Sequence, residues 1–279
     1  MTSLPAITAH NGFALPAIGL GTYGLRGADG AAAVAAAIDG GYRLVDSAFN
    51  YENEGAVGRG VADAGVDRAE IIVTTKLPGR HHGAAQAQWS IEESRFRLGL
   101  DATDLNLIHW PNPSQDEYVQ AWAALIEAQQ RGIVRQIGVS NFLPEHLERL
   151  ERETGVLPVV NQIELHPYFP QAEQLAYHRE HGIITEAWSP LGRGRELLAE
   201  PVIVEIAAAH GVSPAQTVLA WHVARGVVSI PKASSFEHQQ SNLAAASVVL
   251  EHAEVDAITA LGRADGRLFD GDPRTHEES

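Results

Sequence analysis

The sequence contains a carboxylate, a phenol, an amine and an imidazole at positions from which they could share one site. Asp46 precedes Tyr51 by five positions in DSAFNYENE. Lys76 and His109 each end a short apolar run. A phenol has a pKa of about 10, so Tyr51 would exchange protons near neutrality only if a cation such as Lys76 lowered that pKa. Asp46 could hold the lysine charged, and His109 could hydrogen-bond a substrate oxygen, although either aromatic ring could instead be ordinary core packing.

A glycine-rich stretch raises a second possibility. GLGTYG (19–24) matches G-x-G-x-x-G, the phosphate-binding fingerprint of dinucleotide-binding domains. That fold needs a buried strand leading into the glycines and a helix opening on the third. Here Pro16 interrupts the strand, and the first helical pattern begins only after RGADG. We interpret Gly19 and Gly21 as a tight strand exit that lets a loop approach a pocket.

Short runs rich in Val and Ile alternate with longer segments of helical spacing, which is typical of a parallel sheet. The strand candidates are 17–21, 43–46, 71–76, 105–109, 136–140, 159–164, 183–189 and 227–232. Helical patterns cover 31–39, 117–132, 144–155 and 195–211, with Gly40, Gly132 and Gly155 at helix C-termini. No linker divides the chain. We expect residues 1–279 to form one α/β domain, a (β/α)8 TIM barrel with a short N-terminal β-hairpin.

Active-site groups of such barrels lie at the C-terminal ends of the strands. The predicted ends carry Asp46, Lys76, His109, Ser140 with Asn141, Gln162 with Glu164, Trp188 with Ser189, and Lys232. A single polar strand end is often only a cap. Polar or aromatic residues at seven of the eight predicted ends favour one shared site.

Composition excludes several kinds of partner. The formal net charge of −15 disfavours a surface for polyanions, so we expect no nucleic-acid partner. There is no cysteine, which excludes disulfides, thiolate nucleophiles and cysteine-based metal sites and fits a reducing compartment. Residues 1–16 lack a basic start followed by a long apolar core, and no apolar run is long enough to span a membrane. We expect a cytoplasmic monomer without a metal or a membrane partner.

The motifs taken together resemble the aldo-keto reductase superfamily, particularly its prokaryotic 2,5-diketo-D-gluconate reductases. The matching segments are GLGTY, DSAFNYENEGAVG, TTKL, LNLIHWP, GVSNF, NQIELHP, WSPLGRG and IPK, in the family's order over nearly the whole chain. The resemblance implies a barrel enzyme that reduces small carbonyl substrates with NAD(P)H. It also implies a catalytic tetrad in which Tyr51 donates a proton, Lys76 lowers the phenol's pKa, Asp46 supports Lys76 and His109 orients the carbonyl oxygen.

The same resemblance implies the binding residues. Ser140, Asn141 and Gln162 would hold the nicotinamide carboxamide, Trp188 would stack on its ring, and SPLGR (189–193) would follow the pyrophosphate. The full implied cofactor set is Gly21, Thr22, Ser140, Asn141, Gln162, Trp188, Ser189, Leu191, Gly192, Lys232, Ser234, His238 and Asn242. Tyr23, Phe49 and Trp110 would line a pocket for small or medium aldehydes, ketones and dicarbonyls.

The sequence departs from the family pattern after the eighth strand. IPKASSFEHQQSN keeps Lys232 but has Ala233 in place of a serine and His238 in place of an arginine that binds the 2′-phosphate. We therefore expect NADP(H) as the cofactor, with NAD(H) accepted better than in arginine-bearing relatives. Pro78 stands where many relatives carry tryptophan, and the acidic tail LFDGDPRTHEES is expected to cover less substrate than longer tails do.

Two other functions fit parts of the sequence. A nucleotide-binding sensor or accessory subunit could use the same fold without catalysis, although the tetrad is intact. A glycoside hydrolase could use Glu164 and Glu186 as paired carboxylates, but Glu186 lies inside a strand and Glu164 belongs to a structural signature. The pair His81 and His82 is expected to lie in a solvated loop rather than to bind a metal.

Overall fold

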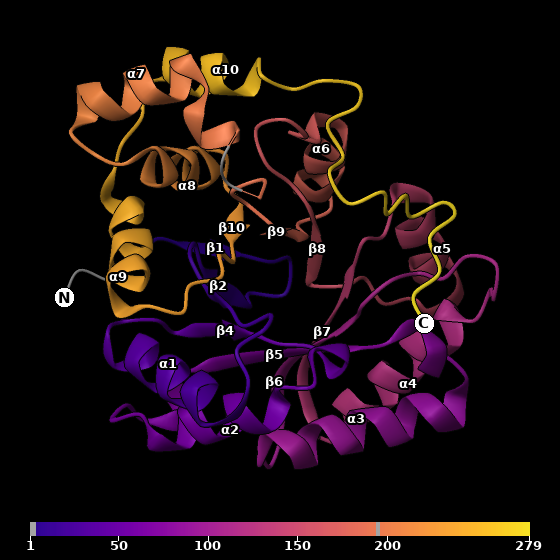
Figure 1. Cartoon of the computed structure of the whole chain (residues 1–279). Coiled ribbons are helices and arrows are strands. Elements are labelled where there is room, and N and C mark those ends of the chain that lie inside the picture. The colour runs from indigo at the N-terminus through magenta and orange to yellow at the C-terminus, as the bar shows by residue number, and fades with distance from the viewer. Residues whose placement is uncertain (1–3, 194–195) are drawn as a thin grey trace.

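Eight parallel strands follow one another in chain order around a ring, which makes the fold a (β/α)8 barrel (Figure 1). The computed structural model describes residues 4–193 and 196–279. The strands are β3 (Leu20–Gly21), β4 (Leu44–Asp46), β5 (Ile72–Leu77), β6 (Thr103–Ile108), β7 (Val134–Ser140), β8 (Val160–Glu164), β9 (Ile184–Trp188) and β10 (Val228–Ser229). Bridges from Ile18 to Ser229 and from Gly21 to Lys232 close the ring. The predicted barrel is confirmed, and this strand order excludes a doubly wound dinucleotide-binding sheet.

Helices cover the outside of the ring (Figure 1). They are α1 (Gly27–Asp39), α2 (Glu54–Asp63), α3 (Ala84–Leu98), α4 (Tyr118–Gln130), α5 (Pro144–Thr154), α6 (Ala172–Glu180), α7 (Pro201–His210), α8 (Pro214–Ala224), α9 (Phe236–Ala244) and α10 (His252–Thr259). Among the described residues, no single helix is long and apolar enough to cross a membrane. The bent pair α7 and α8, at 90°, meets the length and composition criteria only when its members are taken together.

The predicted N-terminal hairpin is confirmed and closes one end of the barrel. Its strands are β1 (Ala6–Thr8) and β2 (Ala14–Pro16), paired antiparallel. Leu15 of β2 is buried in one cluster with Leu44, Ile184 and Val228, the first residues of β4, β9 and β10. The hairpin therefore packs under the N-terminal ends of the strands, and the C-terminal ends face away from it.

Packing of α1 and α2 on the barrel fixes the loop that follows β4. Val34 and Ile38 of α1 and Val57 of α2 are buried together with Val45 and Val73 of the neighbouring strands. Burying an aliphatic side chain of this size stabilises the fold by about 1.5–3 kcal/mol. The segment between β4 and α2, which carries Tyr51, is thus held at both ends by buried side chains.

Several element boundaries differ from the sequence prediction. The first helix begins at Gly27, inside RGADG, and Gly24 before it has φ +79°, so the third glycine indeed opens no helix. Gly40 ends α1 in a right-handed conformation, and the left-handed residue is Gly41 at φ +116°. The predicted helix over 195–211 is interrupted, because α7 begins only at Pro201. Residue 195, where the predicted helix starts, lies outside the described residues.

The first and last strands are shorter than predicted. Regular pairing in β3 covers only the last two residues of the predicted 17–21, and β10 covers two residues of 227–232. Pro16 and Pro231 flank these strands and have no N–H to donate to a ladder. Isolated bridges and hydrogen bonds such as Gly19 N to Ser229 O, 2.8 Å, complete the ring instead.

Candidate active site

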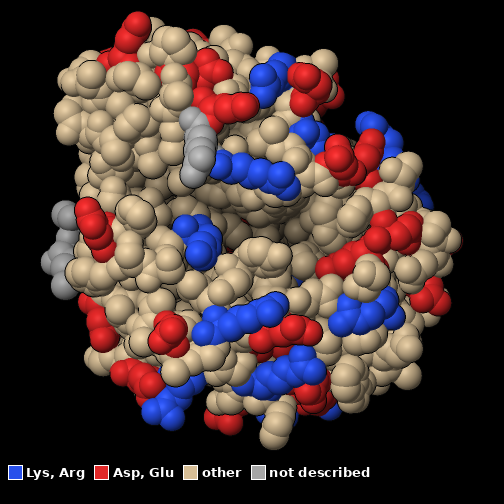
Figure 2. Space-filling model, in the orientation of Figure 1, with Lys and Arg blue, Asp and Glu red and all other residues tan. Residues whose placement is uncertain are grey.

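A cavity of about 590 Å³ opens at the C-terminal ends of the strands. Figure 2 shows a hollow at the centre of this face, with lysine or arginine side chains at its rim. Its lining includes Gly21, Thr22, Tyr23, Asp46, Tyr51, His109, Trp110, Ser140, Asn141, Gln162, Trp188, Ser189, Arg193, Lys232 and Phe269. Residues from most of the predicted strand ends therefore meet at one cavity.

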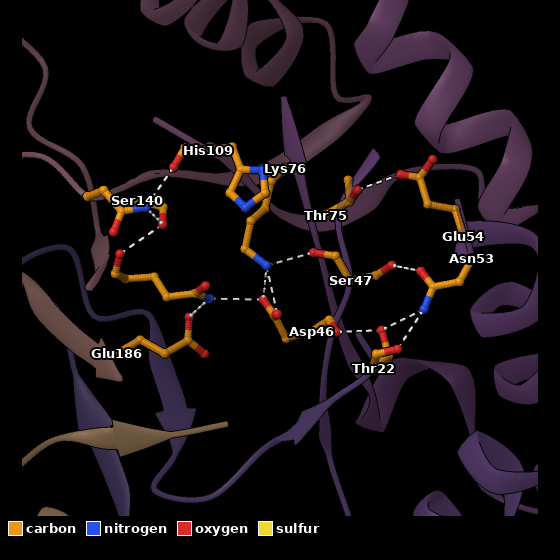
Figure 3. A network of polar contacts seen from close by, with 12 residues as sticks. Thr22, Asp46, Ser47, Asn53, Glu54, Thr75, Lys76, His109, Ser140 and Glu186 are labelled. Carbon is orange, nitrogen blue, oxygen red and sulfur yellow. Dashed lines mark hydrogen bonds and ion pairs between the residues drawn. The ribbon is translucent and has the colours of Figure 1, made fainter. Parts of the chain in front are cut away.

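A buried ion pair lies at the bottom of this site. The Nζ atom of Lys76 lies 2.7 and 2.8 Å from the two carboxylate oxygens of Asp46 and donates a third hydrogen bond, of 2.8 Å, to the Ser47 carbonyl (Figure 3). Both side chains are fully enclosed. Burial alone would lower the pKa of Lys76, but the Asp46 carboxylate and Tyr51 outweigh it and raise that pKa above its ordinary value. Lys76 is thus a permanent cation.

Tyr51 lies in a short 3-10 turn, Phe49–Tyr51, rather than at the start of a helix, because α2 begins only at Glu54. Its ring centroid is 5.0 Å from Lys76 Nζ. Burial raises the pKa of the Tyr51 phenol, and the charge of Lys76 lowers it by a smaller amount, so the net direction is upward. Lys76 lowers the pKa of the phenol, as predicted, but not enough to offset burial. Tyr51 therefore keeps its proton at neutral pH.

His109 follows β6 directly and faces Tyr51 edge to face, with ring centroids 5.9 Å apart. Its backbone carbonyl accepts a 3.0 Å hydrogen bond from the Asn141 amide, which ties it to the next strand end. Its Nδ1 atom lies 2.6 Å from a carboxylate oxygen of Glu278, although the ring N–H is poorly directed at that oxygen.

Ser140, Asn141, Gln162 and Trp188 form one hydrogen-bonded chain along the cavity wall. Asn141 donates to the Ser140 hydroxyl at 3.0 Å and accepts from Trp188 Nε1 at 2.8 Å. Gln162 donates at 2.9 Å to Asp46 and at 2.7 Å to Glu186 (Figure 3). Both amide hydrogens of Gln162 are thus used, which leaves its oxygen as an acceptor.

If Trp188 stacks on the nicotinamide as the resemblance implies, Trp188→Ala is expected to weaken NADPH binding by about tenfold, because an aromatic platform is lost. The protein fluorescence quench on NADPH binding should shrink with it. Titration of wild type, Trp188→Ala and the control Trp89→Phe tests this, since Trp89 lies on the outer face of α3 and is half exposed. An unchanged quench in the alanine variant would place the cofactor against another tryptophan.

Several predicted residues lie outside the cavity. The Phe49 ring packs against Trp89 of α3, and its centroid lies 4.2 Å from the guanidinium of Arg97. Phe49 therefore lines a neighbouring cavity instead of the predicted substrate pocket. Leu191 packs against the core, and Gly192, at φ +53°, has no room for a side chain because Leu197 lies 2.9 Å from the Cβ position.

The residues expected to hold the 2′-phosphate lie at the outer end of the site. Lys232, Ser234 and His238 are exposed, between β10 and the first turn of α9, whereas Asn242 is buried. Ser235 caps α9 by accepting from the His238 N–H at 3.3 Å. None of the ion pairs between described residues involves Lys232, so its charge is available to an anion.

Asn53 is a polar group of the site that the sequence analysis missed, and Glu164 and Glu186 lie buried near the site. Asn53 donates to both oxygens of Thr22, at 2.8 and 3.1 Å, and accepts from Ser47 at 2.8 Å (Figure 3). Glu186 is buried in the barrel, and burial together with the charge of Asp46 raises its pKa to about 8. Glu164 binds the backbone N–H of Leu268 at 2.7 Å. Neither glutamate lines the cavity, which argues against a glycoside hydrolase pair.

The paired histidines do not form a solvated loop, so that prediction is wrong for His82. His82 is fully buried, and burial lowers its pKa to about 4, so the ring is neutral at pH 7. His81 turns elsewhere, with its Nδ1 atom 2.5 Å from the Ser90 hydroxyl. Over residues 4–193 and 196–279, no cluster of three or more metal-ligating side chains occurs.

Comparison with known proteins agrees with this geometry. The model of the Aldo/keto reductase family matches residues 17–263. The chain belongs to this family. It is 54% identical over 278 residues to 2,5-diketo-D-gluconic acid reductase B of Corynebacterium sp. (strain SHS752001), with all of both chains covered. Morphine 6-dehydrogenase of Pseudomonas putida is 42% identical, with 99% of this chain and 96% of that protein covered.

Solved structures of relatives share the whole barrel. A mutant of Gox0644 in complex with NADPH superposes with a TM-score of 0.93, at 42% identity and 98% coverage of both chains. The Bombyx mori aldo-keto reductase AKR2E4 in complex with NADP gives a TM-score of 0.89 at 32% identity, with 97% of this chain and 96% of that chain covered. The family and fold inferred from the sequence motifs are both confirmed.

Proposed function

We propose that this protein reduces aldehydes, ketones or dicarbonyls to alcohols with NADPH, using Tyr51 as the proton donor. The observation that carries the proposal is the enclosed Asp46–Lys76 pair, with Lys76 Nζ 5.0 Å from the Tyr51 ring at the bottom of an open cavity. A fixed cation beneath a protonated phenol suits an oxygen that gains negative charge during reaction, because it stabilises the transition state more than the ground state.

The residues of the cavity fit NADP(H). Gly21 lines the cavity, and a side chain is excluded there by the barrel itself, since a Cβ would lie 2.6 Å from the Ile230 carbonyl oxygen. The Gln162 oxygen and the hydrogen-bonded Ser140 and Asn141 would hold the carboxamide, and Trp188 would support the ring. Lys232 would pair with the 2′-phosphate. The cofactor, when bound, supplies the hydride.

The side chains of this protein would then move the proton. Tyr51 donates its proton to the carbonyl oxygen as that oxygen becomes an alkoxide, and the positive charge of Lys76 stabilises the resulting phenolate. Asp46 keeps Lys76 charged and holds its ammonium group close to Tyr51. His109 hydrogen-bonds the carbonyl oxygen and fixes its direction relative to Tyr51.

A direct assay tests the reaction class. NADPH and a small dicarbonyl are mixed with the purified protein, and NADPH absorbance and alcohol product are followed together. We expect stoichiometric loss of NADPH and gain of alcohol. A sensor or accessory subunit on the same fold would bind NADPH, measured by fluorescence, without consuming it.

We further propose a cytoplasmic monomer formed by one barrel domain. The absence of cysteine fits a reducing compartment. Large apolar side chains that are exposed on the described part of the chain, such as Phe96 and Val249, are few.

His238→Arg is expected to sharpen the preference for NADPH over NADH by about ten- to 150-fold, because a charged guanidinium binds phosphate in a fixed fork whereas histidine lacks this paired geometry. The measurement is kcat/KM for both cofactors in wild type and variant. A wild-type NADPH preference beyond about a thousandfold, with no gain from arginine, would contradict this role of His238.

A further inference from the structure

The C-terminal segment, residues 266–279, lies along the substrate side of the site rather than away from it. In Figure 1 it runs from α10 past α6 and α5 toward α4. The backbone N–H of Leu268 is bound by Glu164, Phe269 packs edge to face on Trp188 at 5.0 Å, and the ring of His276 lies 4.1 Å from Trp110. The tail therefore forms part of the pocket wall.

Near its end the tail is held by a buried asparagine. The Asn112 side chain donates to the Glu278 carbonyl at 2.8 Å and accepts from the Glu278 N–H at 3.0 Å, across 166 positions of sequence. Asn112 is fully buried and packs on Gly79, where a Cβ would lie 2.3 Å from its amide. This paired contact fixes where the Glu278 side chain starts.

The carboxylate of Glu278 then meets two hydrogen-bond donors and the ring nitrogen of His109. One oxygen lies 2.7 Å from the Asn50 amide and 2.6 Å from His109 Nδ1, and the other accepts from the Gly79 N–H at 2.8 Å. Asn50 immediately precedes Tyr51, so these donors border the reacting group. The Glu278 side chain is only 11% exposed.

The carboxylate is ionised in this position. Burial alone would raise the pKa of Glu278, but the interaction with His109 and the hydrogen bonds from Gly79 and Asn50 outweigh burial and hold the pKa below its ordinary value. A negative charge therefore stands against the catalytic histidine at neutral pH.

We propose that Glu278 is a specificity-determining residue that fills a carboxylate-binding subsite formed by Asn50, Gly79 and His109. The inference rests on the proposed carbonyl reduction. In the native chain this subsite is taken by the protein's own carboxylate, so the pocket favours neutral carbonyl substrates and disfavours those with a carboxylate next to the carbonyl. Removing Glu278 frees Asn50, Gly79 and His109 for the carboxylate of a 2-oxo acid.

Two effects act in the same direction. The tail carboxylate repels a substrate carboxylate, and it also occupies the donors that would bind one. A unit charge about 6–12 Å away, at an effective dielectric constant of about 20, changes affinity on the order of ten- to a hundredfold. The change should appear mainly in KM for the acid, because the proton donor is untouched.

A matched substrate pair tests the proposal. Phenylglyoxylate and phenylglyoxylamide have nearly the same shape and differ in charge. We expect Glu278→Gln and Glu278→Ala to raise the ratio of kcat/KM for the acid to that for the amide by at least about tenfold. Any effect on His109 that both substrates share cancels in this ratio. Gln keeps the length of the side chain, which separates loss of charge from loss of the tail contact.

Glu277→Ala is the matched control, because it removes the same charge from the tail while its carboxylate binds the Ser114 N–H at 2.7 Å instead of His109. The acid-to-amide ratio should stay at the wild-type value in this variant. A ratio within about threefold of wild type in both Glu278 variants, with amide reduction intact, overturns the subsite. Absence of amide reduction in every chain, wild type included, overturns the proposed reaction instead.

Discussion

Tyr51→Phe is expected to lower kcat for carbonyl reduction by about a hundredfold to ten-thousandfold, the range that a positioned general acid contributes. The affinity for NADPH should change little, because the lost hydroxyl is needed only when charge develops on the carbonyl oxygen. The burial that raises the pKa of this phenol keeps it protonated, as a donor must be, and Lys76 stabilises the phenolate that it leaves. Steady-state kinetics and NADPH titration of the purified variant measure both quantities.

Tyr23→Phe is the matched control for this substitution. Tyr23 packs edge to face on Tyr51 at 5.2 Å and lines the same cavity, but its side chain is 69% exposed and no cation lies beneath it in the described structure. Its variant should keep most of the activity. Equal activity of Tyr51→Phe and wild type would assign proton donation to another group.

Lys76→Met is expected to lose activity to a similar extent and to destabilise the fold as well. The Asp46 carboxylate would remain buried without its cation, which typically costs about 3–5 kcal/mol of unfolding free energy. Urea unfolding measures this loss, and the pH profile of the residual kcat measures the effect on the phenol. Methionine has a similar length, so little packing is lost.

The double variant Lys76→Met/Asp46→Asn separates the two roles of the lysine. Removing both charges should recover much of the stability, because no unpaired carboxylate remains, whereas activity should stay low. Recovery of activity together with stability would mean that Lys76 acts only through the fold. An unchanged pH profile in Lys76→Met would likewise contradict its electrostatic role toward Tyr51.

The fold and the meeting of the candidate residues at one cavity were predictable from local patterns. Apolar runs of strand length, separated by helical periods, predicted eight parallel strands, and a polar residue at the end of such a run must lie at the C-terminal rim. Asp46 and Lys76 end neighbouring strands, so their contact follows from strand order. The ends of β3 and β10 were less predictable, because prolines shorten regular pairing while single bridges still close the ring.

The tail contacts were not predictable in this way. Glu278 reaches His109 only because Asn112, far away in sequence, pairs with its backbone, and no periodicity encodes such a contact. His82 was expected to be solvated from its polar type, yet the tertiary fold buries it. Glu186 likewise points into the barrel beside Gln162, a placement that depends on strand register rather than on composition.

Transfer of hydride from the cofactor to the carbonyl carbon is the central claim, and an isotope measurement tests it most directly. NADPH carrying deuterium at its transferable position is incubated with the protein and a small dicarbonyl, and the alcohol is analysed by mass spectrometry and NMR. We predict one deuterium on the former carbonyl carbon of each alcohol formed, with one NADP+ per alcohol. Tight NADPH binding without deuterium transfer to any of a panel of aldehydes, ketones and dicarbonyls would contradict the account and favour a non-catalytic role.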